Sequence, residues 1–250
     1  YTTVLRCAAS HYVIALHHYL RSDVVDMIRH LIEVTRKDPA YHNCNYKVFS
    51  EIHLDNAGEW AVDSTAWNQV VDDLGIKCRY SCPDRKESNA GAESSVQIVE
   101  IVTKATLLQQ NLPDFWWQEC CDSGVYCLNR LPDSEHKANM PSDGDCVLPI
   151  EAFTRFQHSR RAIMRELSYY LPPGTPALCH DPNIKGSAVE PKTRWGICKA
   201  MLGDQPIWEC PFTKAEWRTK SYCSFKLEGI NFAQFLNLPK LESSRKGCAI

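Results

Sequence analysis

Long apolar stretches are missing from this sequence. None approaches the roughly 18 residues that a membrane-spanning helix needs, so we expect no contact with a membrane. An internal repeat is also missing, which excludes the repeat architectures. The first residue is Tyr1 rather than Met, and we therefore expect the true start of the protein to lie upstream.

The composition is that of an ordinary globular protein. Hydrophobic residues make up 44% of the chain and charged residues 23%, which is a typical balance for a protein that buries a core. The 250 residues are enough for one large domain or two modest ones.

The 13 cysteines are an odd number, so they cannot all pair with one another. They are scattered through apolar segments, as at Cys120, Cys121 and Cys127, which favours reduced and buried thiols. A zinc site is the alternative, although the spacing of its candidate ligands along the sequence matches no common zinc-finger pattern. The ligands of such a site would be His42, Cys44, Cys78 and Cys82.

Charge is distributed unevenly along the chain. Residues 1–150 carry 13 Lys and Arg against 21 Asp and Glu, a net charge of −8, whereas residues 151–250 carry 15 against 9, a net charge of +6. This asymmetry predicts that the second part contacts a polyanion. It argues against DNA binding by the first part, because neutralisation of phosphates supplies most of the affinity of a protein for DNA.

Apolar periodicity predicts a mixed α/β domain in the first part. Two short runs, Val4–Ala8 and Tyr12–Leu16, indicate a hairpin of strands. Helical spacing follows Ser22 and Ser64, both expected to be N-caps, and Gly75 is expected to end the second helix. The other expected elements are strands over 46–54 and 76–81 and helices over 90–110 and 113–129.

The sequence divides into four segments. Asp133–Asp145 is polar and contains Pro, Gly and Ser, as a linker does. Beyond it, Ile150–Tyr170 has a partly helical pattern, and Trp195–Phe232 is typical of short strands with turns at Gly203-Asp204 and Pro211. We expect a domain over 1–132, a linker and helical segment over 133–169, a small β-rich module over 170–235 and a tail over 236–250.

Three stretches resemble the integrase core of copia-type (Ty1/copia) retrotransposons. His53–Trp60 is similar to the strand-end motif Ser-Asp-Asn-Gly-Gly-Glu-Phe of that family, and Asn89–Glu93 to the Asn-Gly-Val-Ala-Glu that opens its long helix. Leu107–Trp116 and Val125–Pro132 resemble the helix pair that follows.

This resemblance covers roughly residues 1–132 and implies a fold. It implies the α/β fold of the ribonuclease-H-like class, with a mixed sheet and flanking helices, here lacking its first strand. The segment near 190–218, with Trp195-Gly196 and Trp208, resembles the β-module downstream of such cores. The C-terminal part is therefore expected to be a small β-rich module.

The family's chemistry uses three carboxylates that hold two divalent metals. The resemblance implies that Asp55 and Glu93 are the second and third of them, and Mg²⁺ takes such oxygen ligands. Two simpler interpretations stay open, because Asp55 also fits a plain turn at a strand end. Glu93 equally fits a first-turn acid favoured by the helix dipole.

Departures from the family pattern predict a degenerate site. The first carboxylate has no counterpart, since its strand would precede Tyr1, and Cys7 and Ala8 occupy positions where the family often has acids. Basic positions of the long helix are replaced by Ser94, Ser95, Gln97 and Glu100. We therefore expect no enzymatic activity, no bound metal and no cofactor.

We expect instead a domesticated, integrase-like structural subunit of a larger assembly, such as an organellar ribosome. Arginine suits phosphate recognition because its fork donates two bonds, so RNA contact is expected through the basic second part, with a solvated helix face as the alternative. Other protein subunits are the expected partners, and one of them supplies the missing strand. The expected location is the mitochondrion or another organelle, with the nucleus as the alternative. The expected RNA-binding residues are Arg155, His158, Arg160, Arg161 and Arg165.

Two other functions are consistent with the same residues. A retrotransposon integrase fragment would perform Mg²⁺-dependent DNA strand transfer through Asp55 and Glu93. A protein-interaction domain without a nucleic-acid partner would show no steep dependence of RNA binding on salt, which separates it from the RNA-binding subunit.

Overall fold

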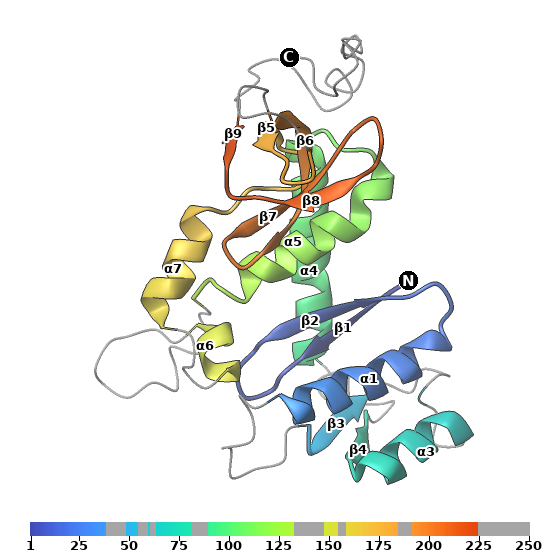
Figure 1. Cartoon of the computed structure of the whole chain (residues 1–250). Helices are drawn as coiled ribbons and strands as arrows, with labels where there is room; N and C mark the ends of the chain where they lie inside the picture. The colour runs from blue at the N-terminus through green and yellow to red at the C-terminus, as the bar shows by residue number, and fades with distance from the viewer. Residues whose placement is uncertain are drawn as a thin grey trace. The chain divides into compact units, whose positions relative to one another are not determined.

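A computed structural model describes residues 1–38, 49–54, 60, 64–81, 90–132, 148–154, 159–184 and 192–224 of the chain. Its elements, labelled in Figure 1, confirm the mixed α/β class. The chain forms two compact units: Tyr1–Ile98 with Pro132–His158, and Val99–Leu131 with Ser159–Ile250. Both units are discontinuous in sequence.

The first unit contains four short strands. β1 (Thr2–Arg6) and β2 (Val13–His17) form the expected antiparallel hairpin, and β3 (Glu51–Leu54) pairs in parallel with β4 (Lys77–Tyr80). Within the described residues these are two separate two-stranded sheets. The single mixed sheet implied by the resemblance is thus not seen among them.

Two amphipathic helices bury the core of the first unit, and both can be followed in Figure 1. α1 (Asp23–Lys37) and α3 (Thr65–Leu74) carry apolar residues at spacings of three and four, so one face of each is buried. Trp67 is fully buried and meets Trp60 edge to face, with ring centroids 5.5 Å apart. The buried residues of this core are Val24, Val25, Ile28, Ile32, Leu54, Trp60, Trp67, Val70 and Ile76.

Capping residues explain where the helices begin and end. Ser64 accepts a hydrogen bond from the Trp67 N–H, and Gly75 ends α3 in the left-handed conformation with φ 58°, as expected. Ser22 occupies the N-cap position of α1, as expected, although its side chain makes no capping hydrogen bond. Asp23, in the first turn, accepts from the Leu20 N–H at 3.0 Å.

The remaining helices follow the predicted pattern closely. α4 (Ala90–Gln109) confirms the long helix, and the helix expected after Pro113 consists of the 3₁₀ turn η3 (Asp114–Trp116) and α5 (Trp117–Leu128). α6 (Pro149–Phe153) and α7 (Arg160–Ser168) confirm the partly helical segment. In the first unit, Phe153 of α6 stacks on Tyr12 with ring centroids 4.3 Å apart.

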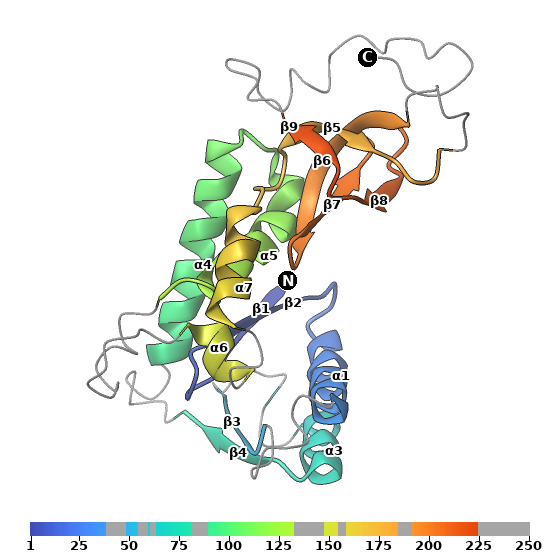
Figure 2. The same cartoon turned by 60° about the vertical axis from the view of Figure 1, so that its left-hand side comes forward.

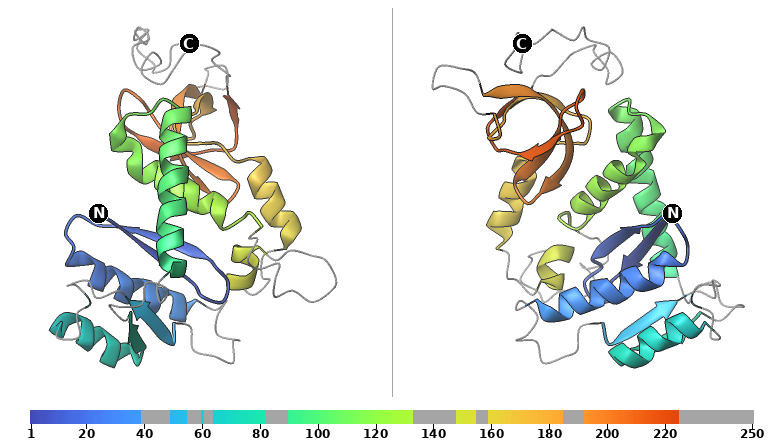
Figure 3. Two further views of the ribbon diagram at one scale, coloured as in Figure 1. Left: turned by 180° about the vertical axis from the view of Figure 1, so that it is seen from behind. Right: turned by 45° about the vertical axis from the view of Figure 1, so that its right-hand side comes forward.

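The second unit contains a five-stranded antiparallel sheet in the order β8-β7-β6-β5-β9. It curls into a barrel-like shape, seen in the right panel of Figure 3. Trp208 is fully buried inside it and donates from its ring nitrogen to the Thr219 carbonyl at 3.1 Å. The strands are β5 (Pro176–His180), β6 (Thr193–Leu202), β7 (Gln205–Glu209), β8 (Glu216–Arg218) and β9 (Tyr222–Ser224).

A second core in this unit joins helices to the sheet. Leu112, Trp116 and Cys120 pack with Ile197 of β6, and Figure 2 shows α5 lying beside that strand. Gly174, at φ +84°, lies so close that a Cβ there would be 2.6 Å from Leu112. Any other residue at 174 would meet both backbone strain and this clash.

Nine cysteines fall within the described residues, and each is a free thiol. Five of them are buried: Cys120, Cys121, Cys179, Cys198 and Cys210. None of the described helices combines the length and apolar character needed to cross a membrane.

Candidate functional site

The two residues that the resemblance assigns to catalysis differ in what the structure shows of them. Asp55 lies outside the described residues and directly follows Leu54, the buried last residue of β3. Glu93 is exposed in the first turn of α4. The start of that helix is tied to β1, because the Arg6 guanidinium donates to the Gly91 carbonyl at 3.0 Å. Across the described ranges, no three His, Cys, Asp or Glu side chains gather as a metal site would require.

The face of α4 that follows Glu93 is not basic. Ser95 is buried and donates to the Gly91 carbonyl at 3.1 Å, while Val96 and Ile98 are exposed. Farther along, Glu100 pairs with Lys104 one turn later at 3.1 Å. These side chains give the helix a mixed apolar and polar surface where the family has phosphate-holding cations.

The predicted basic cluster is described only in part. Arg155 and His158 lie outside the described residues, whereas Arg160, Arg161 and Arg165 are carried by α7. Ser159 caps this helix by accepting from the Ala162 N–H at 3.3 Å. Arg161 and Arg165 are exposed, and Arg160 is half-buried.

Arg165 lines a hollow of about 420 Å³ in the second unit. The side chains around it come from α7, from the turn between β6 and β7, and from the segment that leads into β9. This hollow, called the Arg165 hollow below, is lined by Arg165, Tyr169, Asp204, Lys220 and Tyr222.

Helix α5 and the turn that follows it hold the neighbours of two lining residues of the Arg165 hollow. The Tyr126 hydroxyl donates to the carbonyl of Gly203, the φ 61° residue at the β6–β7 turn. Arg130 donates to the Glu166 carboxylate of α7 at 2.9 Å and 3.0 Å, and its guanidinium lies 3.6 Å from the Tyr126 ring centroid. The pair is largely buried, and such paired, two-bond contacts hold a fixed geometry.

Among the described residues that line the Arg165 hollow, two are positively charged and one is negatively charged. Lys220 donates to the Asp204 carboxylate at 2.6 Å. This hydrogen bond, together with the charges of Lys220 and Arg165, lowers the pKa of Asp204 below its usual value. Burial raises the pKa of the Tyr222 hydroxyl, which therefore stays protonated and able to donate.

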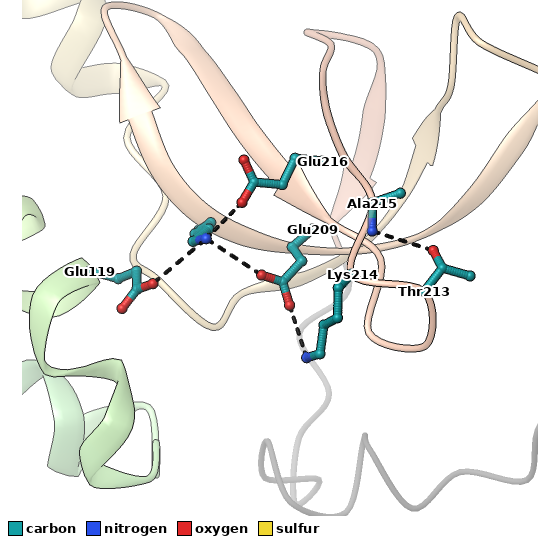
Figure 4. A network of polar contacts seen from close by, with 7 residues as sticks. Glu119, Glu209, Thr213, Lys214, Ala215 and Glu216 are labelled. Carbon is teal, nitrogen blue, oxygen red and sulfur yellow. Dashed lines mark hydrogen bonds and ion pairs between the residues drawn. The ribbon is translucent and has the colours of Figure 1, made fainter.

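A second polar network lies on the sheet of the same unit and is drawn in Figure 4. Lys199 of β6 is 2.6 Å from Glu216, 3.6 Å from Glu209 and 3.9 Å from Glu119 of α5. The bond to Glu216 is the main cause that raises the pKa of Lys199 above its usual value. Lys214 also contacts Glu209, at 2.9 Å. This network ties α5 to three strands.

Several of these residues were not identified from the sequence. Arg165 was predicted, but Tyr169, Lys220 and Tyr222 were not, and Asp204 was predicted only as part of a turn. The Lys199 network was missed as well. Its members lie on different strands and a helix, so no regular spacing along the sequence predicts that they meet.

Comparison with solved structures finds a distant likeness. No protein-family model matches the chain, and neither does any curated protein. A chain in the cryo-EM structure of a simian T-cell lymphotropic virus intasome in complex with PP2A regulatory subunit B56 gamma is 14% identical, with a TM-score of 0.44. The match covers 88% of this chain and 70% of that chain. A likeness of this size decides neither the fold family nor the function.

Proposed function

We propose that this chain is a non-catalytic, integrase-like protein that binds RNA as a subunit of a larger assembly. One observation carries the proposal: two cations from distant parts of the sequence, Arg165 and Lys220, gather with two tyrosines around one hollow of the second unit. An RNA-containing assembly such as an organellar ribosome would provide the partners.

The chemistry of the Arg165 hollow suits nucleic acid. A guanidinium donates two parallel bonds to phosphate, and tyrosine rings provide faces on which unpaired bases stack. Arg161 and Arg165 are exposed on α7, so phosphates can reach them. Because Lys220 is paired with Asp204, we expect binding of modest strength. Contacts of the arginines with phosphates release counterions, so we expect the binding to weaken as salt rises.

Substitution of the α7 arginines tests this proposal. Arg160→Ala, Arg161→Ala and Arg165→Ala together should weaken binding of single-stranded RNA and flatten the salt dependence of log K by about 2, at about 0.7 per phosphate contact. The control removes the same charge elsewhere with Lys77→Ala, Arg79→Ala and Lys104→Ala. If the two triple variants have the same slope, the α7 face is not the RNA-binding surface.

We also propose a ribonuclease-H-like fold for the first part of the chain. Among the described strands and α-helices from β1 to α5, the order is strand, strand, helix, strand, helix, strand, helix, helix, which is the order that the resemblance implies. The described residues of the three sequence motifs lie at the end of β3, in the first turn of α4, and from the end of α4 through η3 and α5. These positions agree with the roles of the motifs in the family.

A partner strand belongs to the same proposal. In the part of the chain that is described, β1 pairs with β2 and β3 with β4, and no other described strand lies at their second edges. A strand from a partner would extend either sheet by strand addition at such an edge. We propose that a partner subunit supplies a strand there. Hydrogen exchange of β1 and β3 amides should slow in the native assembly relative to the isolated chain, and equal rates would contradict this.

The alternative function is metal-dependent DNA strand transfer. One observation favours it, because Glu93 is exposed and so accessible to a metal ion. The deciding assay incubates the chain with end-labelled duplex DNA and Mg²⁺ or Mn²⁺. We expect no products. Cleavage that is lost on Asp55→Asn would establish the alternative and overturn the non-catalytic proposal.

A further inference from the structure

The Arg165 hollow has the size of a small-molecule site. Its volume of about 420 Å³ falls within the roughly 300–1,000 Å³ of such sites. A site of this size accommodates one nucleotide rather than a duplex. Tyr169, one of the lining residues, is 48% exposed, so part of its side chain is accessible to an incoming base.

The acid in the hollow narrows the chemistry of the ligand. A phosphate alone would leave part of Asp204 unused, because its carboxylate accepts from Lys220 at 2.6 Å and has further lone pairs that accept hydrogen bonds and cannot donate them. A ligand that pairs with each of these charged side chains therefore combines an anionic group, for Arg165 and Lys220, with hydrogen-bond donors for Asp204. An aromatic plane in the same ligand would use the two tyrosine rings.

Among the RNA bases, guanine fits this requirement best. Its pairing edge places a ring N–H and an amino group side by side, which matches the two oxygens of a carboxylate. Adenine and cytosine offer an amino group beside an acceptor nitrogen, and uracil offers one N–H between two carbonyls. We infer that the Arg165 hollow binds one guanine nucleotide of a single-stranded RNA, with Asp204 on the base edge and Arg165 and Lys220 on the phosphate.

Rigidity at Asp204 makes such selection possible. The Tyr126 hydroxyl holds the Gly203 carbonyl at 2.8 Å, and Asp204 follows directly in the same turn. Glu166, held by Arg130, would lie 3.9 Å from a Cβ at Gly203, so α7 also adjoins this turn. A carboxylate held in place discriminates between bases better than one on a mobile loop.

Two RNA heptamers, UUUUUUU and UUUGUUU, test the inference by fluorescence anisotropy with the full chain. We expect the guanine-containing heptamer to bind about tenfold more tightly, as a bidentate contact to one base provides. Asp204→Asn should abolish the preference and leave binding of UUUUUUU intact or stronger, because it removes a negative charge. Asp114→Asn is the control, since this exposed acid lies in the same unit but lines no part of the hollow.

The outcomes separate this inference from the proposed function, on which it rests for the source of the nucleotide. Equal binding of the two heptamers overturns the guanine site and leaves RNA binding standing. If no RNA binds, including a longer mixed-sequence strand, the proposed function falls. Titration with GMP and AMP then tests nucleotide binding in the Arg165 hollow without RNA. GMP binding that is lost on Asp204→Asn supports the guanine site, and the absence of GMP binding overturns it.

Discussion

The two units build their interiors differently. Among the described residues, the first has one cluster of apolar side chains between helices and two separate two-stranded sheets. Those of the second form a five-stranded sheet, two apolar clusters and charged pairs that join α5 to β6 and Arg130 to α7. Buried polar groups fix geometry more specifically than apolar contact does, and the second unit is also where the Arg165 hollow lies.

Titratable groups separate the units as well. In the second unit, burial raises the pKa of Cys120 to about 12, of Cys121 to about 11 and of Cys198 to about 12. In the first unit, burial raises the pKa of Cys78 as well. A larger share of buried thiols therefore makes the second unit the more sensitive to alkali.

The largest expected effect comes from removing one buried tryptophan from each unit. Trp67→Ala and Trp208→Ala should each cost about 3–5 kcal/mol, because both side chains are fully buried. Hydrogen exchange followed peptide by peptide should show each loss confined to the unit that carries the substitution. Phe115→Ala is the control, since that ring is 75% exposed. Losses shared by both units would show that they unfold as one.

Alkaline pH should weaken the second unit more than the first. Thiols with raised pKa keep their protons in the folded state but lose them in the unfolded chain above pH 9.0, so stability falls as pH rises from there towards the folded values. Each thiol contributes about 1.4 kcal/mol per pH unit in this window. Denaturant titrations under reducing conditions at several pH values measure the slope of the free energy of unfolding against pH. Cys198→Ala should reduce this slope by about 1.4 kcal/mol per pH unit, the contribution of one thiol. An unchanged slope would contradict the assignment.

Lys199→Met should have a smaller effect. It leaves Glu119, Glu209 and Glu216 without their shared cation, and partial solvent exposure limits the cost to about 1 kcal/mol at neutral pH. In the wild type this stabilisation is present below pH 10.5 and is lost as pH rises through the raised pKa of Lys199. Lys214→Met, at an exposed residue that pairs with Glu209, is the milder control.

The smallest expected effect is that of Glu93→Gln. An exposed acid should change stability by less than about 0.5 kcal/mol when it becomes neutral. Glu151→Gln is the matched control in the same unit, because Glu151 is buried and accepts from the Leu148 N–H at 2.9 Å. Thermal melts compare the two. A large loss for Glu93→Gln would reveal a structural partner for this carboxylate.

Local signals in the sequence were sufficient for the elements but not for every cap. Ser64 and Gly75 mark the ends of α3 because a capping side chain and a left-handed glycine act within one turn of chain. Ser22 occupies the same cap position before α1, yet its side chain makes no capping bond, and its backbone is helical where that of Ser64 is extended. Whether a serine at the cap position makes the bond therefore depends on backbone geometry that composition does not reveal.

The candidate site was predictable only in part, for a related reason. Arg165 belongs to a run of arginines that stands out in the sequence. Lys220 and Tyr222 reach the same hollow only through the curl of the sheet. Asp204 was recognisable as a turn residue, but its bond to Lys220 joins positions sixteen residues apart. Such pairings depend on strand order, which the sequence pattern alone does not determine.

The division of the second unit into two stretches of sequence has a consequence for synthesis of the chain. Val99–Leu131 leaves the ribosome before Ser159–Ile250 exists. Part of the core of this unit therefore stays exposed to water until Ile197 has been synthesised and packs against it. The exposed side chains are those of Leu112, Trp116 and Cys120. During that interval the nascent protein exposes an aggregation-prone apolar surface of the kind that chaperones bind. A stop codon between the two stretches would make this exposure permanent, and the truncated product should aggregate.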